Sequence, residues 1–243
     1  MRIKGRKKIA VVTGAGHRLG KELAHSLSRM GYAIVLHYNT SEFQAQKVAE
    51  LIKDEGVDVF PYKADLTDEM QIMEMWKFIN SLPFDLKILI NSAAIMRHSD
   101  IRTLSYSEFD NTFALNLRAP LFCSQEASKS MSPGGLIINI SDIGAGKNWL
   151  GYPIYSISKS SLEVLTRILA KALAPNIRVN AIAPGLVMPP ESGDDKSWEK
   201  LEAKIPLKRI ATPVEITSAV KFLLLNKYIT GQVIAIDGGY SLL

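Results

Sequence analysis

Short apolar segments alternate with longer amphipathic segments along nearly the whole chain. Apolar, β-branched runs fall at 9–13, 33–37, 57–62, 86–91, 136–140, 178–182 and 233–236, and helical periodicity covers 19–30, 43–55, 68–80, 106–131, 153–173 and 213–225. Strands that are apolar throughout are buried on both faces, and helices between them make right-handed crossovers. The sequence therefore predicts an α/β fold: one domain, 1–243, with a doubly wound Rossmann-type parallel sheet of seven strands and helices on both faces.

Composition narrows the class of protein further. The 243 residues are 47% hydrophobic and 22% charged, and no apolar run reaches the ~20 residues of a membrane span. The basic N-terminus, Met1–Lys8, lacks the apolar segment of a signal peptide. A single cysteine, Cys123, excludes an internal disulfide and favours a cytoplasmic protein with a buried thiol. Despite a net charge of +5, the basic residues are scattered and carry no nucleic-acid signature, so we expect no nucleic-acid, membrane or metal partner.

A glycine-containing turn joins the first predicted strand to the first helix. It reads Thr-Gly-Ala-Gly-His-Arg-Leu-Gly over 13–20, where a pyrophosphate would meet the free N–H groups of a helix N-terminus. Gly14 allows a tight turn and Gly20 allows close helix packing, with Leu19 between turn and helix. Arg18 adds a guanidinium able to reach a phosphate or an acceptor-rich substrate, the alternative being an incidental exposed arginine.

The end of the second strand predicts which dinucleotide is preferred. A carboxylate there would accept from the ribose 2′-hydroxyl and repel a 2′-phosphate. The segment instead offers His37, Tyr38, Asn39 and Ser41, with no carboxylate before Glu42. This pattern favours NADPH over NADH. No arginine or lysine lies in the segment, so the strength of the preference stays open.

A tyrosine and a lysine lie four residues apart in the predicted helix 153–173. Tyr155 and Lys159 therefore share one helical face, where the ammonium is expected to lower the pKa of the phenol from ~10. Such a pair supplies a proton beside a nicotinamide, although Tyr and Lys at this spacing also occur by chance. Asp142, thirteen residues before the tyrosine, can relay the proton. Alternatively, Asp142 caps a loop and Ser141 is the catalytic hydroxyl.

From Lys8 to Leu243 the chain resembles the short-chain dehydrogenase/reductase family. The resemblance rests on five motifs in the family's order: the turn T-G-x-x-x-G-x-G with Arg18 in place of its middle glycine, Asn91-Ser-Ala-Ala94, Asn116, Tyr155-x-x-x-Lys159 and Pro184-Gly185. It implies further contacts: Asp65 and Leu66 with the adenine, Asn91 and Ala93 with the adenosine ribose, and Pro184, Gly185 and Leu186 with the nicotinamide. By the same resemblance, Asn116 holds a water that joins Lys159 to solvent, and the long helices assemble a homotetramer.

Within this family the chain is similar to the pteridine reductases and dihydromonapterin reductases. Three features carry this similarity: Arg18, the stretch His37-Tyr38 with Ser41, and Asp142 where most members have serine. It implies a dihydropterin substrate. Met96 stands where that branch usually has a stacking aromatic residue, and Trp149, Tyr152 and Trp198 are candidates for the same role. The polar segment 186–204 is expected to be a mobile substrate lid.

Together these features predict an NADPH-dependent reductase. Tyr155 is the proton donor, Lys159 its electrostatic partner and Asp142 the relay, and the small-molecule substrate also meets Arg18, Met96 and Trp149. A 3-oxoacyl-thioester reductase is the closest alternative, but it would normally carry serine at 142 and glycine at 18. A non-catalytic NADP(H)-sensing module is the alternative outside enzymes, and it would tend to lose the Tyr–Lys pair.

Overall fold

A single parallel sheet forms the centre of the computed structural model, which describes residues 7–189 and 195–243. Its strand order is β3-β2-β1-β4-β5-β6-β7, which confirms the predicted doubly wound fold. The third strand begins two residues later than predicted. The strands are β1 (Lys8–Val12), β2 (Ala33–Tyr38), β3 (Val59–Lys63), β4 (Asp85–Asn91), β5 (Gly135–Ile140), β6 (Ile177–Pro184) and β7 (Val233–Ile236).

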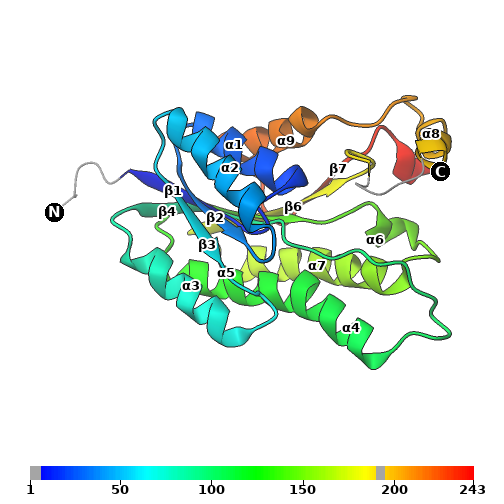
Figure 1. Ribbon diagram of the computed structural model, residues 1–243, viewed down its shortest axis with the longest axis horizontal. Coiled ribbons are helices and arrows are strands. Elements are labelled where there is room, and N and C mark those ends of the chain that lie inside the picture. The colour runs from blue at the N-terminus through cyan, green and yellow to red at the C-terminus, as the bar shows by residue number, and fades with distance from the viewer. Residues whose placement is uncertain (1–6, 190–194) are drawn as a thin grey trace.

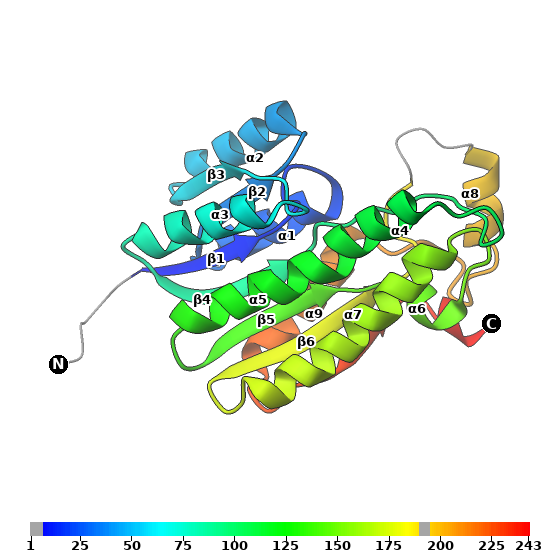
Figure 2. The ribbon, with the colours of Figure 1, turned by 90° about the horizontal axis from the view of Figure 1, so that it is seen from below.

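Helices cover both faces of the sheet (Figures 1 and 2). One face carries α1 (Arg18–Arg29), α2 (Glu42–Asp54) and α9 (Pro213–Leu225); the other carries α3 (Glu69–Ser81), α5 (Ala119–Ser130) and α7 (Pro153–Ala172). Successive strand residues point to opposite faces. Ile9 and Val11 accordingly pack under α3, α5 and α7, whereas Ala10 and Val12 pack under α1, α2 and α9.

The helix predicted over 106–131 is continuous but not uniform. It consists of α4 (Tyr106–Phe113), a π-helical turn η1 (Ala114–Arg118) and α5. π-Helical turns are rare and occur mostly as single turns inside α-helices, so apolar periodicity alone predicts an unbroken α-helix here. Asn116 lies inside this turn and is fully buried.

Three short elements that the sequence pattern does not predict lie at one end of the molecule (Figure 1). They are α6 (Gly144–Lys147), α8 (Asp195–Glu202) and the 3₁₀ turn η2 (Tyr240–Leu242). The predicted lid thus contains a helix, and its residues 190–194 lie outside the described residues, as does most of the basic N-terminal tail. Lys147 Nζ donates to the carbonyl oxygens of Tyr240 and Leu243, which fixes the C-terminal turn against α6.

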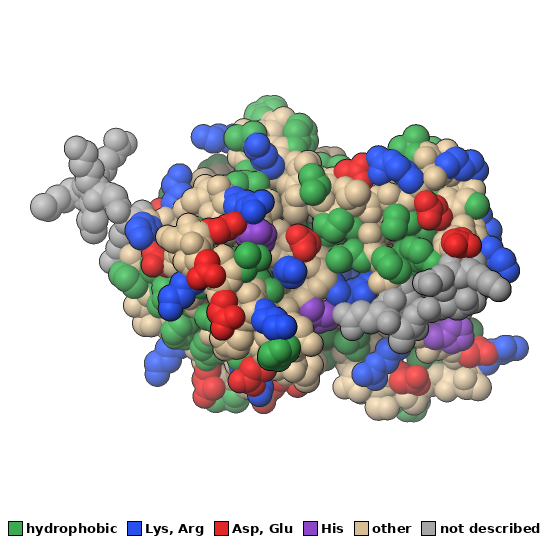
Figure 3. Space-filling view, turned by 45° about the horizontal axis from the view of Figure 1, so that its top comes forward, with side chains coloured by type: hydrophobic (Ala, Val, Ile, Leu, Met, Phe, Trp, Pro, Cys, Tyr) green, Lys and Arg blue, Asp and Glu red, His purple; other side chains and the backbone are tan. Residues whose placement is uncertain are grey.

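The chain order places a crevice at the carboxyl ends of the strands. From β1, the strands β2 and β3 extend the sheet in one direction, and the strands β4 to β7 extend it in the other. The direction in which the chain adds strands therefore reverses between β1 and β4. Ligands of open α/β sheets bind at such a switch point. Basic and acidic side chains are interspersed on the face seen in Figure 3. No helix among the described residues is long and apolar enough to cross a membrane.

Candidate active site

A cavity of about 440 Å³ lies at the carboxyl ends of the central strands. It brings together the glycine turn, the Tyr–Lys pair and the lid. Thirteen predicted site residues line it: Gly14, Arg18, Leu19, Gly20, Ala93, Met96, Asp142, Trp149, Tyr155, Lys159, Pro184, Gly185 and Leu186. In residues 7–189 and 195–243 no group of three His, Cys, Asp or Glu side chains is arranged to hold a metal ion.

The glycine turn has the shape of a phosphate cradle. Gly14 has a φ of +66°, and a Cβ on it would lie 2.8 Å from the Cα of Ala93. A Cβ on Gly20 would overlap the carbonyl oxygen of Gly14. The first turn of α1 has no acidic residue and no side-chain cap, so its N–H groups are available to an anion. The turn therefore fits the pyrophosphate of a dinucleotide.

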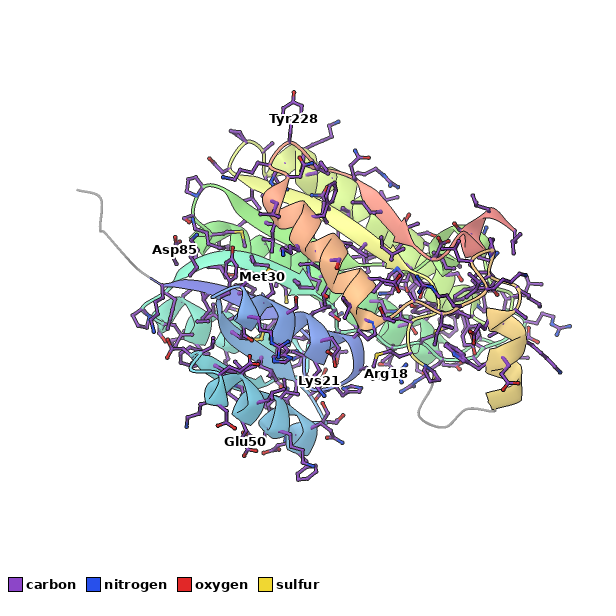
Figure 4. All side chains as sticks on the ribbon, turned by 90° about the horizontal axis from the view of Figure 1, so that it is seen from above. Arg18, Lys21, Met30, Glu50, Asp85 and Tyr228 are labelled. Atoms are coloured by element: carbon purple, nitrogen blue, oxygen red, sulfur yellow. The ribbon has the colours of Figure 1, made fainter. Side chains whose placement is uncertain are left out.

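Arg18 joins this turn to the lid. Its backbone is in the left-handed region, with a φ of +49°, which costs an L residue about 1–2 kcal/mol. Its guanidinium donates to the carbonyl oxygens of Met188 and Pro189, each at 3.0 Å. Figure 4 places Arg18 at one end of α1, near the lid, with Met30 at the other end. Arg18 is therefore not an incidental surface arginine, because its guanidinium is bonded to the lid.

His37 supports the turn from beneath and does not face the cavity. Its Nδ1 accepts from the N–H of Gly14, and its Nε2 donates to the carbonyl oxygen of Ala64, both at 3.0 Å. These partners assign the Nε2–H tautomer. Burial lowers the pKa of His37 to about 4, so the ring is neutral at physiological pH. The His37 side chain is therefore a support of the turn and does not line the cavity; Tyr38 is likewise buried in the core.

Two other residues expected to contact the cofactor have side chains turned into the fold. The Leu66 side chain is buried in the core. The Asn91 amide donates to Asn139 Oδ1 at 2.8 Å and to Ser124 Oγ at 3.2 Å, which links β4 to β5. Both side chains are structural, so a contact of either residue with the cofactor would have to come from its backbone. Asp65 remains partly exposed.

Asp142 and Tyr155 form a direct pair at the centre of the cavity. The Tyr155 hydroxyl donates to Asp142 Oδ2 at 2.9 Å. Asp142 Oδ1 accepts from the N–H of Gly144 at 2.6 Å, so the same carboxylate shapes the loop into α6. Both predicted roles of Asp142, loop cap and partner of the tyrosine, are present together.

Ser141 is directed elsewhere. Its hydroxyl donates to Glu163 Oε1 at 2.9 Å, and only 3% of the residue is exposed. Glu163 lies one helical turn beyond Lys159, on the face of α7 that carries the Tyr–Lys pair. Glu163 is not among the residues predicted from the sequence, although its spacing from Lys159 is a usable signal. The arrangement favours Asp142 over Ser141 as the partner of Tyr155.

Burial dominates the electrostatics of the pair. It raises the pKa of Tyr155 well above 10, and the neighbouring Asp142 carboxylate raises it further. The expected lowering is wrong for this arrangement, because Lys159 Nζ donates to the carbonyl oxygen of Ile140 at 2.8 Å and not to the phenol. Burial lowers the pKa of Lys159 to about 8, opposed by Asp142. Burial also raises the pKa of Asp142. Tyr155 is thus held protonated, as a proton donor requires.

Asn116 braces the back of the site. Its Oδ1 accepts from the N–H of Ile95 at 2.9 Å. Its Nδ2 donates to the carbonyl oxygen of Ile95 at 2.9 Å and to Ser158 Oγ at 3.0 Å. These bonds fix the π turn against the loop after β4 and against α7, which carries the Tyr–Lys pair.

Aromatic side chains form one wall of the cavity. Trp149 and Tyr152 meet edge to face with centroids 6.3 Å apart, and Tyr152 meets His98 in the same way at 5.5 Å. Trp198 lines the cavity from α8, and Met96 lines it from the loop after β4. Edge-to-face contacts fix ring orientation. This wall suits a planar substrate.

A dinucleotide-shaped turn beside a proton-donating Tyr–Lys pair defines a hydride-transferring oxidoreductase. The profile of a family described as enoyl-(acyl carrier protein) reductase matches residues 14–241. The 3-oxoacyl-[acyl-carrier-protein] reductase FabG of Staphylococcus aureus is 34% identical over 239 residues, covering 96% of this chain and 97% of the relative. The chain therefore belongs to the short-chain dehydrogenase/reductase family.

Solved structures are similar over nearly the full length. FolM alternative dihydrofolate reductase 1 from Brucella suis, in complex with NADP, has a TM-score of 0.91 at 32% identity, covering 97% of this chain and 95% of that one. A short-chain dehydrogenase/reductase from Serratia marcescens has a TM-score of 0.91 at 31% identity, with coverage of 97% and 98%.

Proposed function

We propose that this protein is an NADPH-dependent reductase of a dihydropterin. The observation that carries the proposal is the bond from the Tyr155 hydroxyl to Asp142 inside a cavity with an aromatic wall. The cofactor is NADP(H), whose pyrophosphate lies on the turn at the start of α1. The similarity to a dihydrofolate reductase in complex with NADP supports both the proposed cofactor and the proposed substrate, because dihydrofolate itself contains a pterin ring.

The reaction needs one hydride and one proton. When bound, the cofactor supplies the hydride to a ring carbon of the substrate. Tyr155 turns its hydroxyl from Asp142 to the adjacent ring nitrogen and gives up its proton. Lys159 stabilises the phenolate that results. Asp142, whose pKa is raised by burial, returns a proton to the phenolate once it has taken one up from solvent.

The remaining contacts orient the substrate. Trp149 and Tyr152 hold one side of a flat ring, and Met96 covers the ring near the nicotinamide through its polarizable sulfur. Arg18 holds the lid segment through Met188 and Pro189, so the lid keeps water from the reacting atoms.

A 3-oxoacyl-thioester reductase is the second candidate, favoured by the 34% identity with the FabG of Staphylococcus aureus. The two candidate substrates differ in the atom that accepts the proton, a ring nitrogen in a dihydropterin and a carbonyl oxygen in an oxoacyl thioester. A carbonyl oxygen is best served by a tyrosine with a neutral hydroxyl beside it. Here the neighbour of Tyr155 is the carboxylate of Asp142, and the Ser141 hydroxyl is bonded to Glu163, which favours the dihydropterin.

A panel assay that follows NADPH oxidation tests the proposal. Dihydrobiopterin, dihydromonapterin, dihydrofolate and an acetoacetyl thioester are compared at equal concentration. The proposal expects the largest kcat/KM with one of the dihydropterins. A larger value with the thioester, and none with the pterins, would establish the second candidate instead.

We also propose that the enzyme is a homotetramer. Large apolar side chains are exposed along α4, α5 and α7, including Phe109, Phe122 and Ile168, which is 57% exposed. Tyr228, after α9, projects from the molecule in Figure 4. In the C-terminal tail, Leu242 and Leu243 are also exposed, whereas Tyr240 is buried by its own chain.

A further inference from the structure

The segment that follows β2 has no cation of its own to meet a 2′-phosphate. Residues 39–42 carry no lysine or arginine, and His37 and Tyr38 are buried. The neighbouring strand of the sheet, β3, supplies a cation at this position. Lys63, the last residue of β3, is in register with Tyr38, the last residue of β2. Lys63 therefore emerges beside the segment that begins at Asn39.

The side chain of Lys63 reaches over that segment. Its Nζ lies 3.3 Å from Glu42 Oε2 in the first turn of α2. The side chains of Lys63 and Glu42 are 61% and 59% exposed. Ion pairs this exposed contribute little and exchange partners readily. The ammonium is thus positioned at the strand end and free to bind a stronger anion.

The same segment adjoins the phosphate turn. Ser41 Oγ lies against Gly16, where an added Cβ would overlap it. A continuous surface therefore runs from the turn at 14–20, through Ser41, to Lys63. A dinucleotide whose pyrophosphate lies on the turn presents its adenosine ribose at the end of β2.

We propose that Lys63 is the residue that recognises the 2′-phosphate of NADPH and sets the preference over NADH. On binding, its ammonium leaves Glu42 for the phosphate, and Asn39 and Ser41 supply neutral donors beside it. Glu42 is the opposing charge, so the pair lowers affinity for the phosphate in the free protein. This inference rests on the proposed cofactor and not on the proposed substrate.

Cofactor binding, measured as nucleotide fluorescence or by calorimetry without substrate, tests Lys63 directly. Lys63→Gln is expected to raise the Kd for NADPH about 10-fold, the effect of one partly exposed charge pair, and to leave the Kd for NADH within about twofold. Glu42→Gln is expected to lower the Kd for NADPH and not that for NADH. The salt dependence of NADPH binding should weaken in Lys63→Gln.

Lys7→Gln is the matched control. Lys7 forms an exposed pair with Asp58, at 2.8 Å, near the opposite end of β3, so this variant loses the same charge away from the ribose. Its Kd for NADPH should not change. An unchanged Kd in Lys63→Gln, an equal loss for NADPH and NADH, or an equal loss in Lys7→Gln would overturn the inference.

These binding measurements, taken together with the panel assay of substrates, separate this inference from the proposed function. Tight NADPH binding that depends on Lys63, together with thioester and not pterin turnover, overturns the pterin substrate alone. Failure to bind NADPH at all overturns both.

Discussion

Substituting His37 tests whether a buried histidine, and not a cofactor contact, lies beneath the phosphate turn. His37→Phe keeps the ring volume but removes an acceptor from the N–H of Gly14 and a donor from the carbonyl oxygen of Ala64. Each buried group left without a partner costs about 1–3 kcal/mol, so the free energy of unfolding should fall by about 2–6 kcal/mol. NADPH binding should weaken as well, because the turn loses its support.

The pH dependence of the unfolding free energy gives a second, independent test of the burial of His37. Folding lowers the pKa of His37 from about 6.5 to about 4, so between these values only the unfolded chain binds the proton. Stability from this residue is present above pH 6.5 and is lost as the pH falls toward 4. Between pH 7.5 and pH 5 the loss is about 2 kcal/mol. His37→Gln, which offers a donor and an acceptor but does not titrate, should not show this loss.

Urea denaturation at pH 7.5 and pH 5 measures both effects. The difference in unfolding free energy between the two pH values should be about 2 kcal/mol larger in the wild type than in His37→Gln. His17→Gln, which removes an exposed histidine from the same turn, should behave like the wild type. Equal pH differences in the wild type and His37→Gln, or a neutral His37→Phe, would refute the role assigned to His37.

Three further predictions follow from the site and the surface. The kcat/KM should fall above pH 8, because Lys159 has a pKa of about 8 and must be protonated to stabilise the phenolate; a flat profile to pH 10 would contradict this role. Arg18→Gln should raise the rate of proteolytic cleavage in the lid, because the bonds to Met188 and Pro189 are lost, and a rate equal to that of the wild type would count against it. Light scattering at micromolar concentration should give the mass of a tetramer, and a monomer would remove that proposal.

The sequence predicted what regular periodicity encodes. Buried strands and the amphipathic helices between them carry their period in local order, so the sheet and the carboxyl-edge site followed from the pattern. The Asp142–Tyr155 contact was also predictable, because the tyrosine lies in the first turn of a helix and the aspartate closely follows a buried strand.

Other features depend on contacts between distant segments. The bond from Gly14 to His37 and the bond from Ser141 to Glu163 each join segments more than twenty residues apart. No local pattern distinguishes a buried histidine from one that faces a ligand. The register between Tyr38 and Lys63 is likewise a property of the assembled sheet, so the sequence around β2 gives no sign of the cation that β3 places beside it.

The effect of Asp142→Asn on dihydropterin reduction tests the central claim most directly. If Asp142 relays protons through Tyr155, kcat/KM for a dihydropterin falls by at least about 10²-fold, while the Kd for NADPH is unchanged. Ser141→Ala is the matched control, and it should leave both values near those of the wild type because its hydroxyl is bonded to Glu163. An Asp142→Asn variant with normal pterin turnover, beside a Ser141→Ala variant that has lost it, would contradict the account.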